Sequence, residues 1–309
     1  MTNGKSRNTF CALVFAAAVA IVPAGRAQVP AAFVDIGYGA RPMGMGGAFT
    51  AVSDDAHAIF WNPAGLTTLQ AAELTVMHTR QLGLIPYTML AYAMPIGLNA
   101  AGLGVLTSGN DVLQETTLLF SFARKLQLPG LGATALGLNF RYRTASFGNN
   151  SDGGENRSRG SASGYALELG ALWRLGEQLR AGFFLRDLLN NMKYDNSARK
   201  VSYSEKVPTT LIFGLARKFG DRFVLAINWQ PKMETGRPAK FHIGGELAPM
   251  RLIRLRAGMW QNLAADVNRN YGLGIGLNYV HKALTLRFDF AYLVNDLASS
   301  PRISFSLLH

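Results

Sequence analysis

The back half of this chain repeats one pattern, in which apolar and polar side chains alternate for about ten residues at a time. From Leu284 to Tyr292, leucine, phenylalanine and tyrosine occupy every second position, and polar residues such as Arg287 and Asp289 lie between them. Successive side chains of a β-strand point to opposite faces, so one face can meet lipid while the other meets water. Alternation of this length is typical of a membrane-spanning β-barrel.

Fourteen segments after residue 70 show this alternation. An even number lets a single-chain barrel begin and end on the same side of the membrane, and the connections alternate between long and short, as in outer-membrane barrels. The sequence therefore predicts an all-β fold, a 14-stranded antiparallel transmembrane β-barrel in the outer membrane of a Gram-negative type of cell. The longest predicted outward loops are 147–161 and 187–207. The predicted strands are 72–79, 86–95, 97–107, 116–126, 132–146, 162–175, 179–186, 208–218, 222–230, 239–248, 251–260, 269–280, 283–293 and 301–308.

The composition argues against a helical membrane protein. Hydrophobic residues make up 49% of the chain and charged residues 16%. Beyond the N-terminus, however, no apolar run approaches the roughly 20 residues that a spanning helix needs. The other alternative, a soluble β-sandwich, would leave leucines and aromatic rings facing water on many strands.

The N-terminus has the layout of a secretory signal peptide, with two basic residues before an apolar stretch over 10–22 and small residues up to Ala27. We expect residues 1–27 to be removed, and with them Cys11, the only cysteine. The processed chain would then have no thiol for a disulfide, a zinc site or a nucleophile. Removal takes three basic residues and no acid, so the formal charge falls from +12 to +9.

The basic excess does not indicate nucleic acid, because the arginines are spread singly over the predicted strands and loops without interleaved aromatic residues. A charged lumen, or a rim that faces anionic lipopolysaccharide, explains the charge more simply. We therefore expect outer-membrane lipid as a partner and no nucleic acid.

Residues 28–70 do not alternate and contain three motifs: a glycine-rich stretch over 37–49, a Ser-Asp-Asp block at 53–55 and a Trp-Asn-Pro-Ala-Gly block at 61–65. In this order, directly after a signal peptide, they resemble the start of the PorV/PorQ family and its relatives in the FadL superfamily. The resemblance implies a fourteen-strand barrel with an N-terminal hatch, or plug, folded inside the lumen. The predicted organisation is a signal peptide at 1–27, a hatch at 28–70 and the barrel at 71–309.

A hatch is physically reasonable because a fourteen-strand barrel is too wide for its own side chains to fill. Gly44, Gly46 and Gly47 would let the hatch backbone pack closely against the wall. Asp54 and Asp55 would either cap a short helix or pair with arginines of the lumen. The predicted lumen charges are Arg141, Arg143, Glu168, Arg254, Arg256, Arg287 and Asp289.

The resemblance also implies a gate. Asn62, Pro63 and Ala64 match the family's hatch motif residue for residue, and in FadL-like proteins the ligand leaves sideways through a gap in the wall. A glycine or proline that interrupts a strand would permit such a gap, and 97–104 and 244–245 are the candidates. Pro63 with Gly65 is expected to terminate the helix that begins near Asp54.

Other chemistry is weakly indicated. The glycine-rich stretch lacks the Lys-Ser/Thr of a phosphate loop, the histidines have no metal-spaced partner, and no serine stands in a Gly-x-Ser-x-Gly elbow. We expect no metal, no cofactor, no catalytic residues and no enzymatic activity.

Three functions remain open. The leading prediction is passive transport of small hydrophobic molecules across the outer membrane, with a ligand or lipid in the lumen, as the FadL-like resemblance implies. The second is a PorV-like component of a secretion system that binds exported proteins at the cell surface through the long outward loops. The third is a general porin for polar solutes.

Overall fold

The computed structural model describes residues 37–81, 83–110, 112–128, 132–148, 159–197, 200–233, 238–264, 269–295 and 299–309. The predicted signal peptide and the first residues of the predicted hatch lie outside these ranges.

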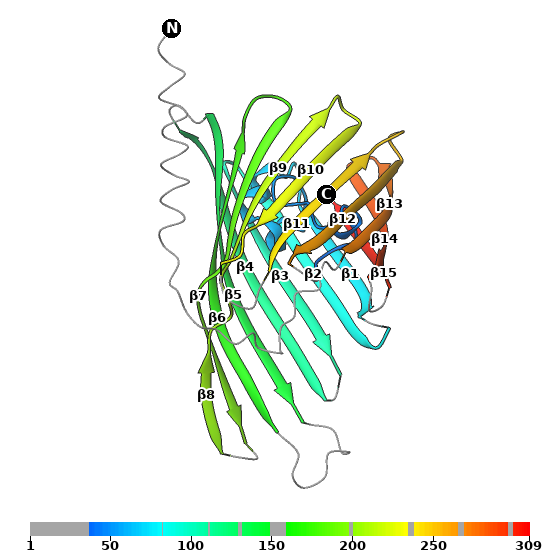
Figure 1. Cartoon of the computed structure of the whole chain (residues 1–309). Helices are drawn as coiled ribbons and strands as arrows, with labels where there is room; N and C mark the ends of the chain where they lie inside the picture. The colour runs from blue at the N-terminus through cyan, green and yellow to red at the C-terminus, as the bar shows by residue number, and fades with distance from the viewer. Residues whose placement is uncertain are drawn as a thin grey trace.

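The strands form one closed antiparallel β-barrel of fourteen strand positions (Figure 1). Neighbours in the chain pair with one another, and β1 (Glu73–Gln81) closes the ring by pairing with β15 (Ser300–Leu308). Two strands, β8 (Val201–Glu205) and β9 (Thr210–Phe219), share the position next to β7 (Leu179–Asn196). Strand β9 pairs with the first half of β7, and the short β8 pairs with its end. The remaining strands are β2 (Ile85–Ile96), β3 (Asn99–Gly109), β4 (Leu113–Leu128), β5 (Gly132–Phe147), β6 (Gly160–Arg174), β10 (Phe223–Gln230), β11 (Ala239–Leu247), β12 (Ile253–Leu263), β13 (Arg269–His281) and β14 (Leu284–Val294).

All fourteen predicted strands are present, most with ends within a few residues of the prediction. The prediction that 187–207 is a loop was wrong, because β7 continues to Asn196 and forms a hairpin with β8. The physical reason is a β-bulge: the β6–β7 register shifts between Leu167 and Leu169, and Asp187 on β7 has a φ of 57°. The shift breaks the two-residue alternation on which the prediction depended. Most of the other predicted long loop, 147–161, lies outside the described residues.

The outer surface of the barrel is apolar. On β5, the four large side chains at every second position from Leu136 to Tyr142 are exposed, and the residues between them are buried toward the lumen. Exposed leucine, isoleucine, phenylalanine and tyrosine side chains recur in the same alternation on β13 and β14. Such a surface is soluble in lipid rather than in water, so the chain is a barrel of the outer membrane.

In the described part of the chain, no helix is long and apolar enough to cross a membrane.

The two sides of the barrel differ in height. Strands β4 to β7 contain 15 to 18 residues each, and together with β8 they reach well beyond the other strands at the lower end of Figure 1. Strands β10 and β11 contain only 8 and 9 residues. The long connections lie at the end of this extension and the short turns at the opposite rim, so the extension faces the outside of the cell.

Residues 37–70, which we call the inner segment, lie inside the barrel (Figure 1). They contain α2 (Ala40–Gly44), α3 (Ala58–Trp61) and the 3₁₀-helix η1 (Pro63–Thr68). Helix α2 contacts β12 to β15, whereas η1 contacts β2 to β6 on the other side of the lumen. The segment therefore reaches across the barrel from wall to wall.

Aromatic rings join the two halves of the inner segment. The Tyr38 and Phe60 rings are stacked with their centroids 5.1 Å apart, and Trp61 meets Phe49 edge-on at 6.3 Å. The Trp61 indole also donates a hydrogen bond to the carbonyl of Tyr38 at 3.0 Å. Stacked and edge-on pairs of this kind add to the stability of the packed core.

Candidate functional site at the inner segment

A network of ion pairs centred on Arg41 connects the inner segment to the wall. Arg41 Nη1 lies 2.7 Å from Asp54 Oδ1 and 2.6 Å from Asp55 Oδ2, and its Nε lies 2.9 Å from Glu246 Oε2 of β11. Burial by itself would lower the pKa of the Arg41 guanidinium, but the three carboxylates raise that pKa well above its usual value. The planar fork of arginine suits a site where several carboxylates converge.

The network continues along the inner face of the wall. Glu246 also accepts a hydrogen bond from Arg256 Nε at 2.6 Å, and Arg256 Nη1 donates to Asp289 Oδ1 of β14 at 2.6 Å. Arg256 and Asp289 are buried, so this chain of alternating charges is screened from solvent. It joins three strands of the wall to the inner segment through Arg41.

Asp55 stands where the inner segment meets β1 and β14. Its carboxylate lies 3.7 Å from Arg287 Nη1 and 2.9 Å from His57 Nδ1, and it accepts a hydrogen bond from the His57 amide at 3.0 Å. Burial by itself would raise the pKa of the Asp55 carboxyl, but His57 and Arg41 outweigh it and hold that pKa well below its usual range. Because the group stays ionised among basic neighbours, its geometry is that of an anchor and not of a proton donor.

A second cluster lies on the other side of the lumen. Arg141 Nε of β5 lies 2.7 Å from Glu168 Oε1 of β6. Asn139 Nδ2 donates hydrogen bonds to Glu168 Oε2 and to the carbonyl of Ile59, both at 2.8 Å. The inner segment is thus held on this side by a neutral amide, while the charges pair within the wall.

The Asn62-Pro63-Ala64 motif is fully buried against β6. Asn62 Nδ2 donates to the carbonyls of Thr50 at 2.9 Å and Ala171 at 3.0 Å, and its Oδ1 accepts from the amide of Ala64 at 3.2 Å. Asn62 therefore caps η1 and fastens it to the wall. Helix α3 ends at Trp61, just before Pro63, as the prediction had it, but Pro63 also begins η1 and Gly65 lies within η1.

Wall glycines face the inner segment around most of the lumen. A Cβ added at Gly137 would overlap the amide nitrogen of Ala64, and one added at Gly244 or Gly258 would overlap the backbone of Met45. The inner segment therefore lies backbone against backbone on the wall. The wall glycines in such contact are Gly137, Gly182, Gly214, Gly244, Gly258, Gly272 and Gly274. Gly102, Gly104 and Gly170 instead face side chains of the inner segment.

The three glycines that the sequence predicted for the hatch lie on the β11–β13 side. Gly46 has a φ of +62° and an added Cβ would lie 2.5 Å from the Met259 amide, so both its conformation and its surroundings require glycine. Gly47 also has a positive φ, +73°. A Cβ on Gly44 would lie 3.2 Å from the Cα of Gly274.

Some predicted partners do not meet. In the described residues Asp54 and Asp55 pair with Arg41, and of the five lumen arginines only Arg287 approaches Asp55. Arg254 is half-buried near the rim of the short turns, where its Nη1 donates to the carbonyl of Met250 at 3.0 Å. Sequence reasoning missed Arg41, although a lone arginine within a glycine-rich, otherwise apolar stretch is a signal for a buried ion pair.

The wall is irregular between β7 and β9. Residues 206–209 are not in a strand, and side chains take the place of the ladder there: Asn190 Oδ1 accepts from the Val207 amide at 2.7 Å and its Nδ2 donates to the Val207 carbonyl at 2.8 Å. Arg143 Nη2 lies 2.8 Å from Asp187 Oδ1 beside this interruption.

The two gaps predicted from sequence were placed wrongly. Residues 99–104 and 244–245 belong to continuous ladders on both sides. Glycine at those positions makes room for the inner segment or for neighbouring side chains and does not interrupt pairing.

These features define a fourteen-stranded outer-membrane barrel that encloses its own N-terminal segment. The chain belongs to the family of type IX secretion system membrane proteins PorP/SprF, whose model matches residues 57–308. The PorV/PorQ name suggested by the sequence motifs is not confirmed by this match, which is to a related family. Comparison with the curated proteins gave no match.

Solved structures of FadL-like channels share the fold. The CymD monoaromatic hydrocarbon channel is 17% identical, with 90% of this chain and 98% of that chain covered and a TM-score of 0.62. A Pseudomonas aeruginosa FadL homologue is 12% identical, with 94% and 99% covered and a TM-score of 0.60. The P. putida toluene transporter TodX is 12% identical, with 88% and 97% covered and a TM-score of 0.58. At these identities the likeness establishes the barrel architecture alone.

Proposed function

We propose that this chain is a non-enzymatic component of a type IX secretion system whose barrel is a closed scaffold, with the tall β4–β8 wall as the surface for exported proteins. Membership of the PorP/SprF family supports the secretion role. The observation that carries the closed scaffold is the contact between wall glycines and the backbone of the inner segment, which recurs on β5, β7, β9, β11, β12 and β13. In this proposal the inner segment is the hatch.

The tall wall carries exposed apolar side chains where β7 continues beyond its pairing with β9. Leu189, Val201 and Tyr203 of the β7–β8 hairpin are exposed, and the Tyr203 ring is stacked on Tyr194 at 5.1 Å. Exposed apolar side chains on a rigid hairpin are typical of protein–protein contact sites. This hairpin covers most of the region that the sequence assigned to the second outward loop.

The experiment compares the secreted proteins of cells that carry wild-type protein, a triple variant Leu189→Ser, Val201→Ser, Tyr203→Ser, and the control Leu84→Ser. Leu84 is an even more exposed apolar residue on the β1–β2 turn, at the outer end of the short side. We expect the triple variant alone to lose export, measured by quantitative mass spectrometry of the medium, and to lose a stoichiometric secreted partner in pull-downs from solubilised membranes. Equal export by all three proteins, at equal barrel yield, would refute the role of this surface.

The second candidate is passive transport of small hydrophobic molecules. It is favoured by the interruption at 206–209, which lies beside a buried apolar cluster of Ala145, Ala162, Met192 and Tyr194 with Val207 packed against it. A ligand could pass from such a cluster through the wall.

Uptake of a hydrophobic tracer distinguishes the secretion component from the transporter, because only a transporter needs the predicted gate. If the barrel transports, Asn62→Ala combined with Pro63→Ala abolishes uptake of a hydrophobic tracer without lowering barrel yield. Unchanged uptake removes the gate role of this motif. A large single-channel conductance of the wild-type protein would instead support a general porin against both candidates.

A further inference from the structure

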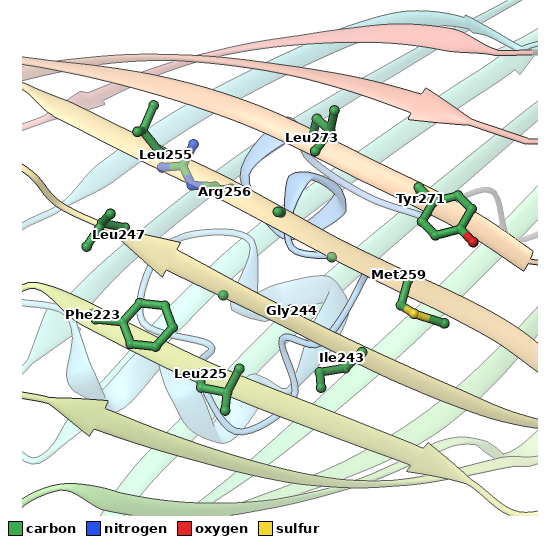
Figure 2. A pocket seen from close by; sticks show the side chains of 13 residues that line it. Phe223, Leu225, Ile243, Gly244, Leu247, Leu255, Arg256, Met259, Tyr271 and Leu273 are labelled. Carbon is green, nitrogen blue, oxygen red and sulfur yellow. The ribbon is translucent and has the colours of Figure 1, made fainter.

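The outer face of β10 to β13 carries an apolar groove of about 560 Å³. Its floor lies at Gly245 and Ala257, which are directly paired across β11 and β12. Figure 2 shows larger side chains around this floor, with the ribbon of the inner segment behind the strands. The apolar side chains that line the groove are Phe223, Leu225, Ile243, Leu247, Leu255, Met259, Tyr271 and Leu273.

This groove lies in the band of the barrel that faces lipid. Leu225, Leu247, Leu255 and Leu273 are among the exposed apolar side chains of the outer surface, and their positions follow the outward alternation of their strands. An unfilled hollow in contact with hydrocarbon loses dispersion contacts, so a flexible chain from the membrane is expected to enter it. Hydrophobicity alone does not select the occupant, because lipid surrounds the whole band.

A cluster of basic side chains lies at the periplasmic end of the groove. The exposed charged residues on the last part of β9 and on the two turns after β9 and β11 are four basic and one acidic: Arg217, Lys218, Asp221, Arg222 and Arg251. Basic residues at a membrane surface attract anionic lipid headgroups. The cluster therefore supplies the selectivity that the apolar lining lacks.

The groove and the basic cluster are continuous. Leu225 of the groove is paired with Arg217 of β9, and the Arg217 guanidinium lies over the Phe219 ring, 4.9 Å from its centroid. Arg222 directly precedes Phe223 of the groove, and its carbonyl accepts a hydrogen bond from the Ala248 amide at 2.7 Å, which joins the two turns. A chain in the groove thus ends beside several guanidinium groups.

We propose that this surface binds one anionic phospholipid of the inner leaflet, with an acyl chain in the groove and the phosphate held by Arg217, Arg222 and Arg251. A phosphate diester in contact with arginine forms charge-assisted hydrogen bonds. In a zwitterionic headgroup the lipid's own cation partly neutralises the phosphate, so the attraction to arginine is weaker. The site is independent of the proposed secretion role and of the contents of the lumen.

The test uses native mass spectrometry of the full-length protein in a neutral maltoside detergent. Phosphatidylglycerol is the probe, and phosphatidylcholine with identical chains and inorganic phosphate are the comparisons. We expect phosphatidylglycerol to form a one-to-one adduct, phosphatidylcholine to bind at least about tenfold more weakly, and inorganic phosphate to give neither an adduct nor competition.

Two variants probe the two halves of the site, each with a control on the opposite side of the ring. Ala257→Leu fills the groove and is matched by Ala101→Leu, an outward alanine of β3. Arg217→Gln with Arg222→Gln removes two charges and is matched by Arg124→Gln, an exposed arginine toward the same rim on β4. We expect Ala257→Leu to lose the adduct and the arginine pair to weaken it by about fivefold per charge, while both controls bind as wild type does.

Three results would overturn the proposal: equal binding of the two lipids, equal behaviour of Ala257→Leu and Ala101→Leu, or a wild-type dimer that Ala257→Leu alone disrupts. The last result would mean that a second copy of the chain fills the groove. The heat-dependent mobility of folded barrels on gels confirms that each variant is folded, so a loss of lipid is not a loss of structure.

Discussion

The two sides of this barrel hold the inner segment by different means. On the β11–β14 side the strands are short, and charged groups reach across the boundary through Arg41, Glu246 and Asp55. On the β3–β7 side most strands are longer, and the segment is held by amide hydrogen bonds from Asn62 and Asn139 and by apolar packing. Buried charges are costly when a partner is lost, whereas apolar contacts weaken by degrees. Loss of one charged partner on the first side should therefore release the inner segment abruptly, whereas loss of single contacts on the second side should loosen it gradually.

The largest effect is expected from Arg41→Met. The substitution leaves Asp54, Asp55 and Glu246 without their shared cation, and breaking buried pairs of this kind costs about 3 to 5 kcal/mol. We expect a lower unfolding temperature of the barrel and a steady conductance in planar bilayers, because the inner segment is released. The control is Arg180→Met, which removes one long contact of 3.5 Å to the Val52 carbonyl. If Arg41→Met has the unfolding temperature and the conductance of wild type, the charged side does not hold the segment.

The next effect comes from adjacent glycines of β11 that face opposite ways. In Gly244→Ala the new methyl group overlaps the backbone of Met45, whereas in Gly245→Ala its nearest neighbour is the Phe223 ring at 3.1 Å. Overpacking against fixed backbone costs about 1 to 3 kcal/mol. We expect Gly244→Ala to increase protease cleavage within the inner segment and Gly245→Ala to leave it unchanged. Equal cleavage of the two variants would contradict the backbone-to-backbone fit.

A smaller effect is expected on the tall side from Asn190→Ala. This change removes both hydrogen bonds to Val207, each with a net contribution of about 1 kcal/mol, where regular strand pairing is interrupted. We expect faster amide hydrogen exchange at 206–209 while exchange in β10 and β11 is unchanged. Asn191→Ala, at the exposed neighbouring position, is the control. Unchanged exchange in Asn190→Ala would show that other contacts close the wall there.

The sequence predicts the barrel well because strand alternation is a local property. Each lipid-facing strand shows its two faces without knowledge of its neighbours. The prediction fails at Asp187, where a bulge shifts the faces, and the continuation of β7 was taken for a loop. The alternation of apolar and polar residues does not reveal a single residue with an uncommon φ.

The site is harder to predict because it depends on which strand meets which part of the inner segment. Arg256 and Asp289 could be assigned to the lumen from their positions in alternating segments, but not to each other, since their strands are separated by β13. Arg41 lies in a stretch with no period that would mark its burial. Its three partners are 13, 14 and 205 residues away, and only the folded path of the segment brings them together.

The smallest effect expected under mild conditions is that of pH on the charged side. Because the folded-state pKa of Asp55 is lowered, its pairs contribute stability above the unfolded pKa of about 3.9, and that stability is lost as pH falls through the lower folded value. Protease protection of the inner segment should therefore stay constant from about pH 7 to pH 5 and decline only below about pH 4. Asp55→Asn should be less protected than wild type at neutral pH and approach it in acid, because protonation removes the same charge. If protease protection of the wild-type protein already declines between about pH 7 and pH 6, a group other than Asp55 is responsible. An aspartate with a lowered pKa stays ionised in that range.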